Sequence, residues 1–356
     1  MAAVSTKQKE DSWAWVQIGE PFPDGPVRVI GQQNQYVALW YKHGKPVCGR
    51  AWNDGGRVQC SFPFKDKELT GQKDLGGQIQ ILQYDTWREP LHAWRDCGYW
   101  YEWVPWSQRR KPNCQVVRCG DVAPLLMPAP DGEMLCGNME MTSETASISF
   151  NGGAIIKTSN LGNLLTVVRN FADPTYGPVA KIYDDIWSDL KEGDDFSRVR
   201  YPISAMGKCL TFYSCRPLKG VSGPAAHSCV ALWYIHGLPV MGAMWNEGGR
   251  IRARFGFNGH EYKDNVGNIQ VLVYDPTRAG FNISWQPYSI ASKVGGLWRP
   301  VKVKDCAPCV IPDKNGVEHL GRVQISEEKA AYPENGKEVT FVGPVVQQFH
   351  VLCRDK

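Results

Sequence analysis

The chain has 356 residues, a net charge of +4 and 43% hydrophobic residues, which together describe a folded protein and exclude a largely disordered one. Its length suits two domains, because single hydrophobic cores rarely grow beyond about 250–300 residues. The small net charge argues against nucleic acid as a partner, and no stretch reaches the roughly 18 apolar residues of a membrane span. The first ten residues lack the apolar core of a signal peptide, so we expect a cytosolic protein.

In chain order, a polar arm over residues 1–12 precedes a series of predicted strands. Val37–Tyr41 is wholly apolar, and a His-Gly turn signal separates it from a second strand over Pro46–Trp52. Asn-Asp-Gly-Gly, a strong tight-turn sequence, then leads into Arg57–Phe62. Arg57–Phe62 and Gly77–Tyr84 both alternate apolar and polar residues, which is the period of a half-buried strand.

This pattern occurs twice, at a constant offset of 193 residues over the best-matched part. Ala-Leu-Trp-Tyr-x-His-Gly-x-Pro-Val is found at 38–47 and 231–240, and Trp-Asn-(Asp/Glu)-Gly-Gly-Arg at 52–57 and 245–250. We therefore predict a mainly β protein with two tandem homologous domains, 1–172 and 173–356, each built on antiparallel strand meanders. The residues that both copies keep at turns and strand cores are interpreted as scaffold: Trp40, Gly44, Pro46, Trp52, Gly55, Gly56, Trp233, Gly237, Pro239, Trp245, Gly248 and Gly249.

Few helices are expected, and the segment at about 178–191 is the one predicted. Pro178 suits a first helical turn, and Gly193 can end the helix. Between them, apolar residues recur at helical spacing, at Val179, Ile182, Tyr183, Ile186, Trp187 and Leu190. Two interpretations stay open: an elaboration packed on the second domain, or a helix between the domains that fixes their orientation.

The repeat also bears on the twelve cysteines. The other copy has Met241 opposite Cys48 and Leu320 opposite Cys136, and such apolar replacements indicate thiols that act as small core hydrophobes. Cys306-Ala307-Pro308-Cys309 has the spacing of a redox or zinc half-site, but no second pair stands at a suitable distance. We predict reduced, structural thiols and no metal site.

The ionisable residues shared by the copies offer little for catalysis. His43 and Asp54 fall in successive turns, at opposite ends of a strand of about seven residues and so about 20 Å apart. Asp54 and Asp85 can lie at the same end and pair, although an aspartate in a turn more often caps backbone amides. Phosphate-binding loops, nucleophile elbows and metalloprotease motifs are missing from the sequence, so we predict neither enzymatic activity nor a cofactor.

Partner binding is expected where the copies differ. The third strand of the second copy carries three arginines on one face, where the first copy has Arg57, Gln59 and Ser61. Such a row suits an acidic partner. The simpler reading is a strand face exposed to solvent. The first copy has an aromatic insertion, whose Trp103 and Trp106 align with aromatic residues and are assigned to the core. The remaining Trp, Tyr and Arg residues are typical interface anchors. The predicted partner-binding set is Arg250, Arg252, Arg254, Trp100, Tyr101, Arg109 and Arg110.

The two repeated blocks at 38–47 and 52–57 resemble those of the second type of nematode major sperm protein fibre protein, and the resemblance covers essentially the whole chain. It implies a cytosolic accessory protein of the crawling sperm cell, in the cytoskeleton of the pseudopod. Such a protein promotes assembly of major sperm protein filaments into fibres and has no enzymatic activity. Many Ser and Thr residues are available, so a regulatory kinase is a further candidate partner.

A tandem lectin-like carbohydrate-binding protein is the alternative, because short meanders rich in Trp and Gly also suit glycans. That reading requires the same exposed aromatic and polar groups in both copies. An enzyme is a third reading, and it requires a pocket that brings groups such as Asp54 and Asp85 within reach of each other.

Overall fold

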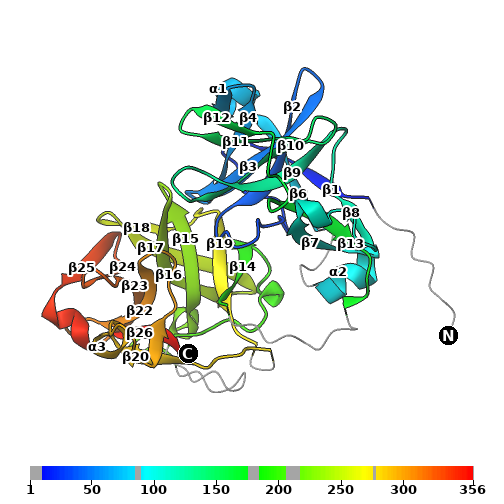
Figure 1. Cartoon of the computed structure of the whole chain (residues 1–356). Helices are drawn as coiled ribbons and strands as arrows, with labels where there is room; N and C mark the ends of the chain where they lie inside the picture. The colour runs from blue at the N-terminus through cyan, green and yellow to red at the C-terminus, as the bar shows by residue number, and fades with distance from the viewer. Residues whose placement is uncertain (1–9, 85–89, 175–183, 206–216, 276–277, 356) are drawn as a thin grey trace. The chain divides into compact units, whose positions relative to one another are not determined.

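The computed structural model describes residues 10–84, 90–174, 184–205, 217–275 and 278–355 (Figure 1). Contacts between Cα atoms divide the chain into two units. The first comprises Met1–Asn53 and Arg57–Pro178, and the second Asp54–Gly56 and Val179–Lys356. The domain boundary between 172 and 173 stays a prediction.

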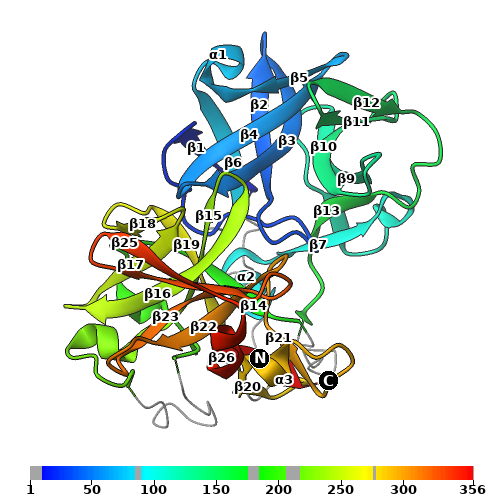
Figure 2. The same ribbon diagram turned by 90° about the vertical axis from the view of Figure 1, so that its left-hand side faces the viewer.

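One antiparallel sheet of 13 strands forms the first unit, in the order β1-β6-β2-β3-β4-β5-β12-β11-β10-β9-β13-β7, with β8 also paired to β13 (Figure 2). The short helices are α1 (Gly71–Leu75), α2 (Pro90–Cys97) and the 3-10 turn η1 (Trp106–Gln108). The strands are β1 (Ser12–Gln17), β2 (Tyr36–Lys42), β3 (Lys45–Asp54), β4 (Arg57–Phe64), β5 (Lys67–Thr70), β6 (Gln78–Gln83), β7 (Trp100–Pro105), β8 (Cys114–Val116), β9 (Val122–Pro128), β10 (Met134–Glu140), β11 (Thr145–Phe150), β12 (Gly153–Lys157) and β13 (Leu165–Asn170).

The second unit repeats this order as β14-β19-β15-β16-β17-β18-β25-β24-β23-β22-β26-β20, with β21 paired to β26. Its helices are η3 (Phe196–Arg198), η4 (Pro224–His227), α3 (Tyr288–Ala291) and η5 (Pro344–Gln348). The strands are β14 (Ile186–Lys191), β15 (Cys229–Ile235), β16 (Leu238–Glu247), β17 (Arg250–Phe257), β18 (His260–Lys263), β19 (Asn268–Val273), β20 (Ile283–Pro287), β21 (Trp298–Pro300), β22 (Cys306–Pro312), β23 (Glu318–Gln324), β24 (Lys329–Glu334), β25 (Lys337–Val342) and β26 (His350–Asp355). The identical strand order confirms the mainly β prediction and its two tandem repeats.

The predicted helix at about 178–191 is wrong over its last turns. Ile186–Lys191 is the strand β14, paired with β19 from Ile186↔Val273 to Lys191↔Asn268, while 178–183 lie outside the described residues. β14 pairs with β19 in the second unit as β1 pairs with β6 in the first. A short isolated helix is marginal in water, so the neighbouring strand's backbone groups override the local pattern. The two strands share only a tryptophan, at Trp13 and Trp187, which hid the match.

Each unit is also doubled internally. In the first unit, the meanders β2-β3-β4-β5 and β9-β10-β11-β12 are each closed by a returning strand, β6 and β13, and they join through β5 and β12. A glycine in the second strand of each meander permits close approach: a Cβ on Gly49 would lie 2.4 Å from the Ser61 carbonyl oxygen, and one on Gly137 2.1 Å from that of Ser147. Gly242 and Gly321 repeat this arrangement in the second unit, at 2.4 and 2.2 Å. The basic building block is therefore a half-unit.

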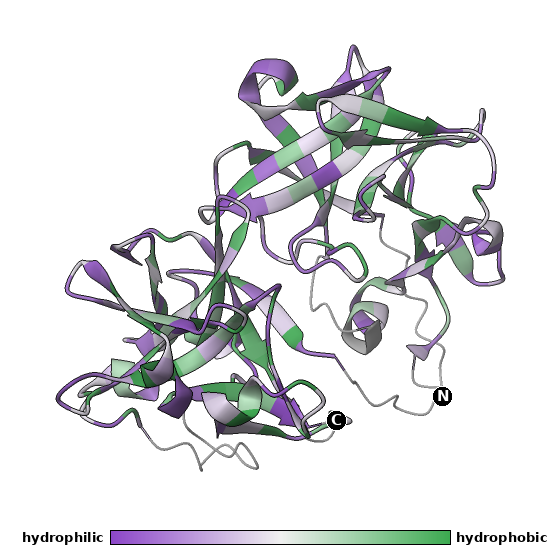
Figure 3. Ribbon diagram, turned by 60° about the vertical axis from the view of Figure 1, so that its left-hand side comes forward, coloured by the Kyte–Doolittle hydropathy of each residue, from purple (hydrophilic) through white to green (hydrophobic). Residues whose placement is uncertain are grey.

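Alternating residues along the strands build the core (Figure 3). In β4, Val58, Cys60 and Phe62 are completely buried, as the sequence pattern predicts. The buried tryptophan of the repeated block also finds a hydrogen-bond partner in each unit: Trp40 Nε1 donates to the Leu75 carbonyl at 2.9 Å, and Trp233 Nε1 to that of Val266 at 3.0 Å. Apolar burial and indole hydrogen bonding together explain why both copies keep this tryptophan.

The shared His-Gly pair forms the turn between the first two strands of the first meander in each unit, β2–β3 and β15–β16. His43 and Gly44 have φ angles of +51° and +75°, and His236 and Gly237 have +51° and +70°. Two successive positive φ angles are the requirement of a two-residue hairpin turn whose twist matches that of its strands. The turn position that we predicted for His43 is confirmed.

Candidate functional site

The predicted arginine row lies on β17. Arg250 and Arg252 are exposed and Arg254 is half-buried, while the alternating Ile251, Ala253 and Phe255 on the other face are in the core. The expected alternation is therefore present, but its three arginines occupy different environments.

Arg252 is surrounded by carboxylates. Its guanidinium lies 3.3 Å from Glu247 and 3.9 Å from both Glu192 and Asp264. Burial raises the pKa of Glu192, and the negative charge of Asp264 raises it further. The hydrogen bond from the Val266 amide and the positive charge of Arg252 lower this pKa, but by less. The surface around Arg252 is therefore mixed in sign, and an acidic partner would have to displace these carboxylates.

Arg254 stacks on a tryptophan of its own unit. The guanidinium carbon lies 5.8 Å from the centre of the Trp245 ring, within the range of a cation–π interaction. Burial lowers the pKa of Arg254, opposed by the charges of Glu261 and Glu334. These contacts make Arg254 part of the scaffold of the unit.

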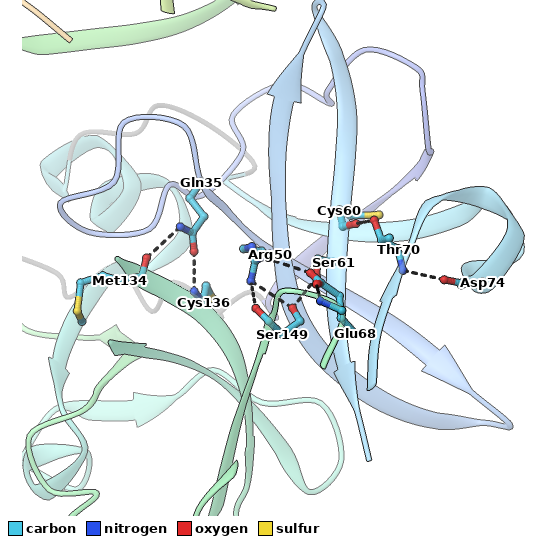
Figure 4. A network of polar contacts seen from close by, with 11 residues as sticks. Gln35, Arg50, Cys60, Ser61, Glu68, Thr70, Asp74, Met134, Cys136 and Ser149 are labelled. Atoms are coloured by element: carbon cyan, nitrogen blue, oxygen red, sulfur yellow. Dashed lines mark hydrogen bonds and ion pairs between the residues drawn. The ribbon is translucent and has the colours of Figure 1, made fainter. Parts of the chain in front are cut away.

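In the first unit, an arginine of the neighbouring strand occupies the equivalent place beside the tryptophan. Arg50 on β3 lies 5.7 Å from the centre of the Trp52 ring, and its counterpart in the second unit is Ala243, which pairs directly with Arg254. Arg50 donates to the Ser149 carbonyl at 2.7 Å and forms a 3.4 Å ion pair with Glu68 (Figure 4). One half-buried positive charge beside one tryptophan is thus kept in both units, although the strand that carries it changes.

The aromatic insertion is tied into the first unit more firmly than the sequence suggested. Tyr101 is 7% exposed, and its hydroxyl donates to Asp11 Oδ1 at 3.0 Å. Burial and the charge of Asp11 raise the pKa of Tyr101. Trp100 is half-buried and donates from Nε1 to the Ala172 carbonyl at 3.1 Å. The interface role that we expected for Tyr101 needs correction, because its side chain belongs to the core and is closed to a partner.

The two arginines that follow the insertion also differ. Arg109 lies 4.2 Å from the centre of the Trp106 ring and forms a 2.8 Å ion pair with Glu144. Arg110 is exposed. Of the predicted partner-binding set, Arg110, Arg250 and Arg252 are therefore the most accessible side chains.

The ten cysteines of the described residues form no disulfide with one another, and eight of them are buried. Burial raises the pKa of Cys60 and Cys136 to about 12, which makes these thiols unreactive at neutral pH. Cys306 and Cys309 lie three residues apart on β22, so they point to opposite faces and pack in different core clusters. A shared metal ion or a disulfide is incompatible with that geometry.

The candidate catalytic pair of Asp54 and Asp85 falls outside the described residues, because Asp85 does. Sequence reasoning missed a different cluster in the second unit, in which side-chain ligand atoms of Asp313, His319 and Glu334 all lie within 4.8 Å of one another. Burial lowers the pKa of His319, against the charge of Glu334. These three residues are widely spaced in the sequence and follow no metal-binding motif, but a position-by-position comparison of the two copies would have found them.

Two comparisons with known proteins identify relatives of the chain. A family model described as "MFP2b: Cytosolic motility protein" matches residues 10–171 and again 184–356. A solved structure, "Crystal structure of the nematode sperm cell motility protein MFP2B", is 39% identical, covers 98% of each chain and superposes with a TM-score of 0.90. No curated protein sequence matches. Within the part of the chain that the structure describes, no helix is long and apolar enough to cross a membrane. The chain belongs to the MFP2b family of cytosolic motility proteins.

Proposed function

We propose that this protein is an accessory factor of amoeboid nematode sperm, where it promotes assembly of major sperm protein filaments into fibres in the pseudopod cytoskeleton. The observation that carries the proposal is the full-length similarity, at 39% identity, to a nematode sperm cell motility protein. A structural role without catalysis agrees with the description of the family as a motility protein.

Two homologous units in one chain favour a bivalent mode of action. If each unit contacts a filament subunit, the second contact forms at an effective concentration set by the linkage, so weak single contacts add to strong attachment. A regulatory kinase is a further proposed partner, since phosphate groups would add negative charge to the mixed surface around Arg252.

Fibre growth from purified major sperm protein, followed by turbidity, tests the function. We expect the full-length chain to speed fibre growth and to sediment with the filaments. Unchanged growth together with a lack of co-sedimentation would refute the proposal. A chain limited to residues 184–356, shown by circular dichroism to be folded, should be much less active than the full-length chain if the bivalent mode is correct.

Arg250 and Arg252 are the proposed filament-contacting residues, and the first unit offers a matched control. Arg250 Nη1 donates to the Gly193 carbonyl at 3.2 Å, and Arg57 Nη1 donates to that of Gly19 at 3.0 Å. The local contact is the same, but Arg57 has Gln59 where Arg250 has Arg252. Arg250→Gln with Arg252→Gln should weaken co-sedimentation, whereas Arg57→Gln should leave it unchanged. Equal effects of the two variants would reject this face.

A further inference from the structure

The second unit contains a buried histidine on the strand β23. His319, the second residue of β23, is 7% exposed, and neither Nδ1 nor Nε2 has a partner among the described residues. The ring is stacked on Tyr332, with 4.0 Å between centres and 12° between planes. Because a buried polar group without a partner is costly, a ligand that this imidazole binds would remove the cost.

Two carboxylates face the same imidazole. Glu334, the last residue of β24, places Oε1 3.7 Å from His319 Nε2, which is too long for a hydrogen bond. Asp313 follows β22, and its Oδ1 accepts the backbone N–H groups of Asn315 and Val317, both at 2.8 Å. These two bonds hold the Asp313 carboxylate near the imidazole before any ligand arrives, as supporting hydrogen bonds do for metal ligands.

The first unit shows that the fold does not need these polar groups. The residues at the corresponding strand positions are Ala129, Leu135 and Phe150, which pack together in one apolar core cluster. The second unit thus replaces three neighbouring apolar side chains by two carboxylates and an imidazole. A single polar replacement among packed apolar side chains would only weaken the packing. Three polar side chains that converge on one point form a set of donors that can bind one ligand together.

We propose that Asp313, His319 and Glu334 bind a divalent transition-metal ion of the zinc type, with water completing its coordination. One imidazole and two carboxylates are ligands that Zn²⁺ accepts at about 2.0–2.2 Å. Tetrahedral ligands at those distances lie about 3.4 Å apart, so the present separations of up to 4.8 Å need only small rotations of the two carboxylates.

Arg254 is the competing cation at this place, because its charge acts on both His319 and Glu334. In the described residues, however, no ion pair within 4.0 Å joins Arg254 to Asp313 or Glu334. Arg254 is instead held over Trp245. The carboxylates are therefore close to a positive charge without being neutralised by it.

Zinc titration of the full-length chain after treatment with a chelator tests the site. We expect one Zn²⁺ to bind and to raise the unfolding temperature. His319→Leu, which introduces the residue of the first unit, should abolish this binding, and Glu334→Gln should weaken it by about 10- to 100-fold or more. His260→Ala removes an exposed histidine of β18 and should have no effect.

Cobalt distinguishes this site from the thiols, because sulfur ligands add an intense near-ultraviolet charge-transfer band. The expected Co²⁺ complex lacks that band and disappears in His319→Leu. Circular dichroism and unfolding in chelator show whether the variants are folded. Wild-type protein that binds no Zn²⁺, or a His319→Leu variant that keeps the same metal, would overturn the proposal.

Discussion

The Arg254 guanidinium lies 5.8 Å from the centre of the Trp245 ring, and in the first unit Arg50 lies at 5.7 Å from that of Trp52. The arginine comes from β17 in one unit and from β3 in the other, on strand positions that are neighbours in the sheet. Both units therefore have a positive charge at the same place beside the tryptophan, but the arginine that carries it stands at a different sequence position in each unit.

Removal of this charge should cost stability, whereas removal of its exposed neighbour should not. Arg254→Ala is expected to lower the free energy of unfolding by about 1–3 kcal/mol, because it deletes the stacking and leaves a gap beside Trp245. Arg252→Ala should cost less than about 1 kcal/mol, since exposed ion pairs contribute little. Urea denaturation of both variants measures the difference, and equal losses would argue against a structural role for Arg254.

The exchange of the arginine between strands predicts a rescue. Arg254→Ser introduces the first unit's residue and should destabilise the second unit. Addition of Ala243→Arg places the guanidinium on the other strand, as at Arg50, and should restore part of the lost free energy. A double-mutant cycle gives the coupling between the two positions, which we expect to be at least about 0.5 kcal/mol. Purely additive losses would contradict this prediction.

Replacement of a closely packed strand glycine by alanine should destabilise the protein by steric clash alone, because alanine adds no polar group. Gly49→Ala would place a methyl group 2.4 Å from the Ser61 carbonyl oxygen and should cost about 1–3 kcal/mol or more through overpacking. Gly153→Ala is the matched control, because its nearest contact would be the Asp66 carbonyl oxygen at 3.6 Å. That variant should stay within about 0.5 kcal/mol of wild type. Thermal unfolding of the two variants checks the contrast.

Asp305 predicts a pH-dependent contribution to stability. Its Oδ2 accepts the Ser326 amide at 2.9 Å and the Ser326 hydroxyl at 2.6 Å. Partial burial raises the pKa of Asp305, but these hydrogen bonds and Lys302 outweigh it and hold the pKa below 3.8. The native state therefore binds this proton less readily than the unfolded state, and the stabilisation is complete above about pH 4 and is lost as the pH falls through the folded pKa.

Comparison of wild type with Asp305→Asn isolates this contribution, because every other titrating group is common to both chains. At pH 7 the variant should be less stable by about 1 kcal/mol. The gap should close as the pH is lowered below 4. A gap that stays constant between pH 7 and pH 3 would contradict the assignment.

The candidate sites were only partly readable from sequence. Alternation in β17 correctly placed Arg250, Arg252 and Arg254 on one face, because strand side chains have a period of two. Alternation does not state what lies over that face, so the stacking of Arg254 and the carboxylates around Arg252 were invisible. Tyr101 was assigned to the surface from the residue opposite it in the other copy, but its ring lies in a core cluster and its hydroxyl donates to Asp11, about 90 residues earlier in the chain.

The sequence by itself determined the doubling of the chain, the strands of the first meander in each unit and the glycine turns between them, because these features follow from local periodicity and backbone conformation. Tertiary structure alone decided that Ile186–Lys191 is a strand, since a partner strand supplied its hydrogen bonds. It also decided that Asp313, His319 and Glu334 meet. Their convergence depends on the register of three strands, and no local pattern records the distance between residues on different strands.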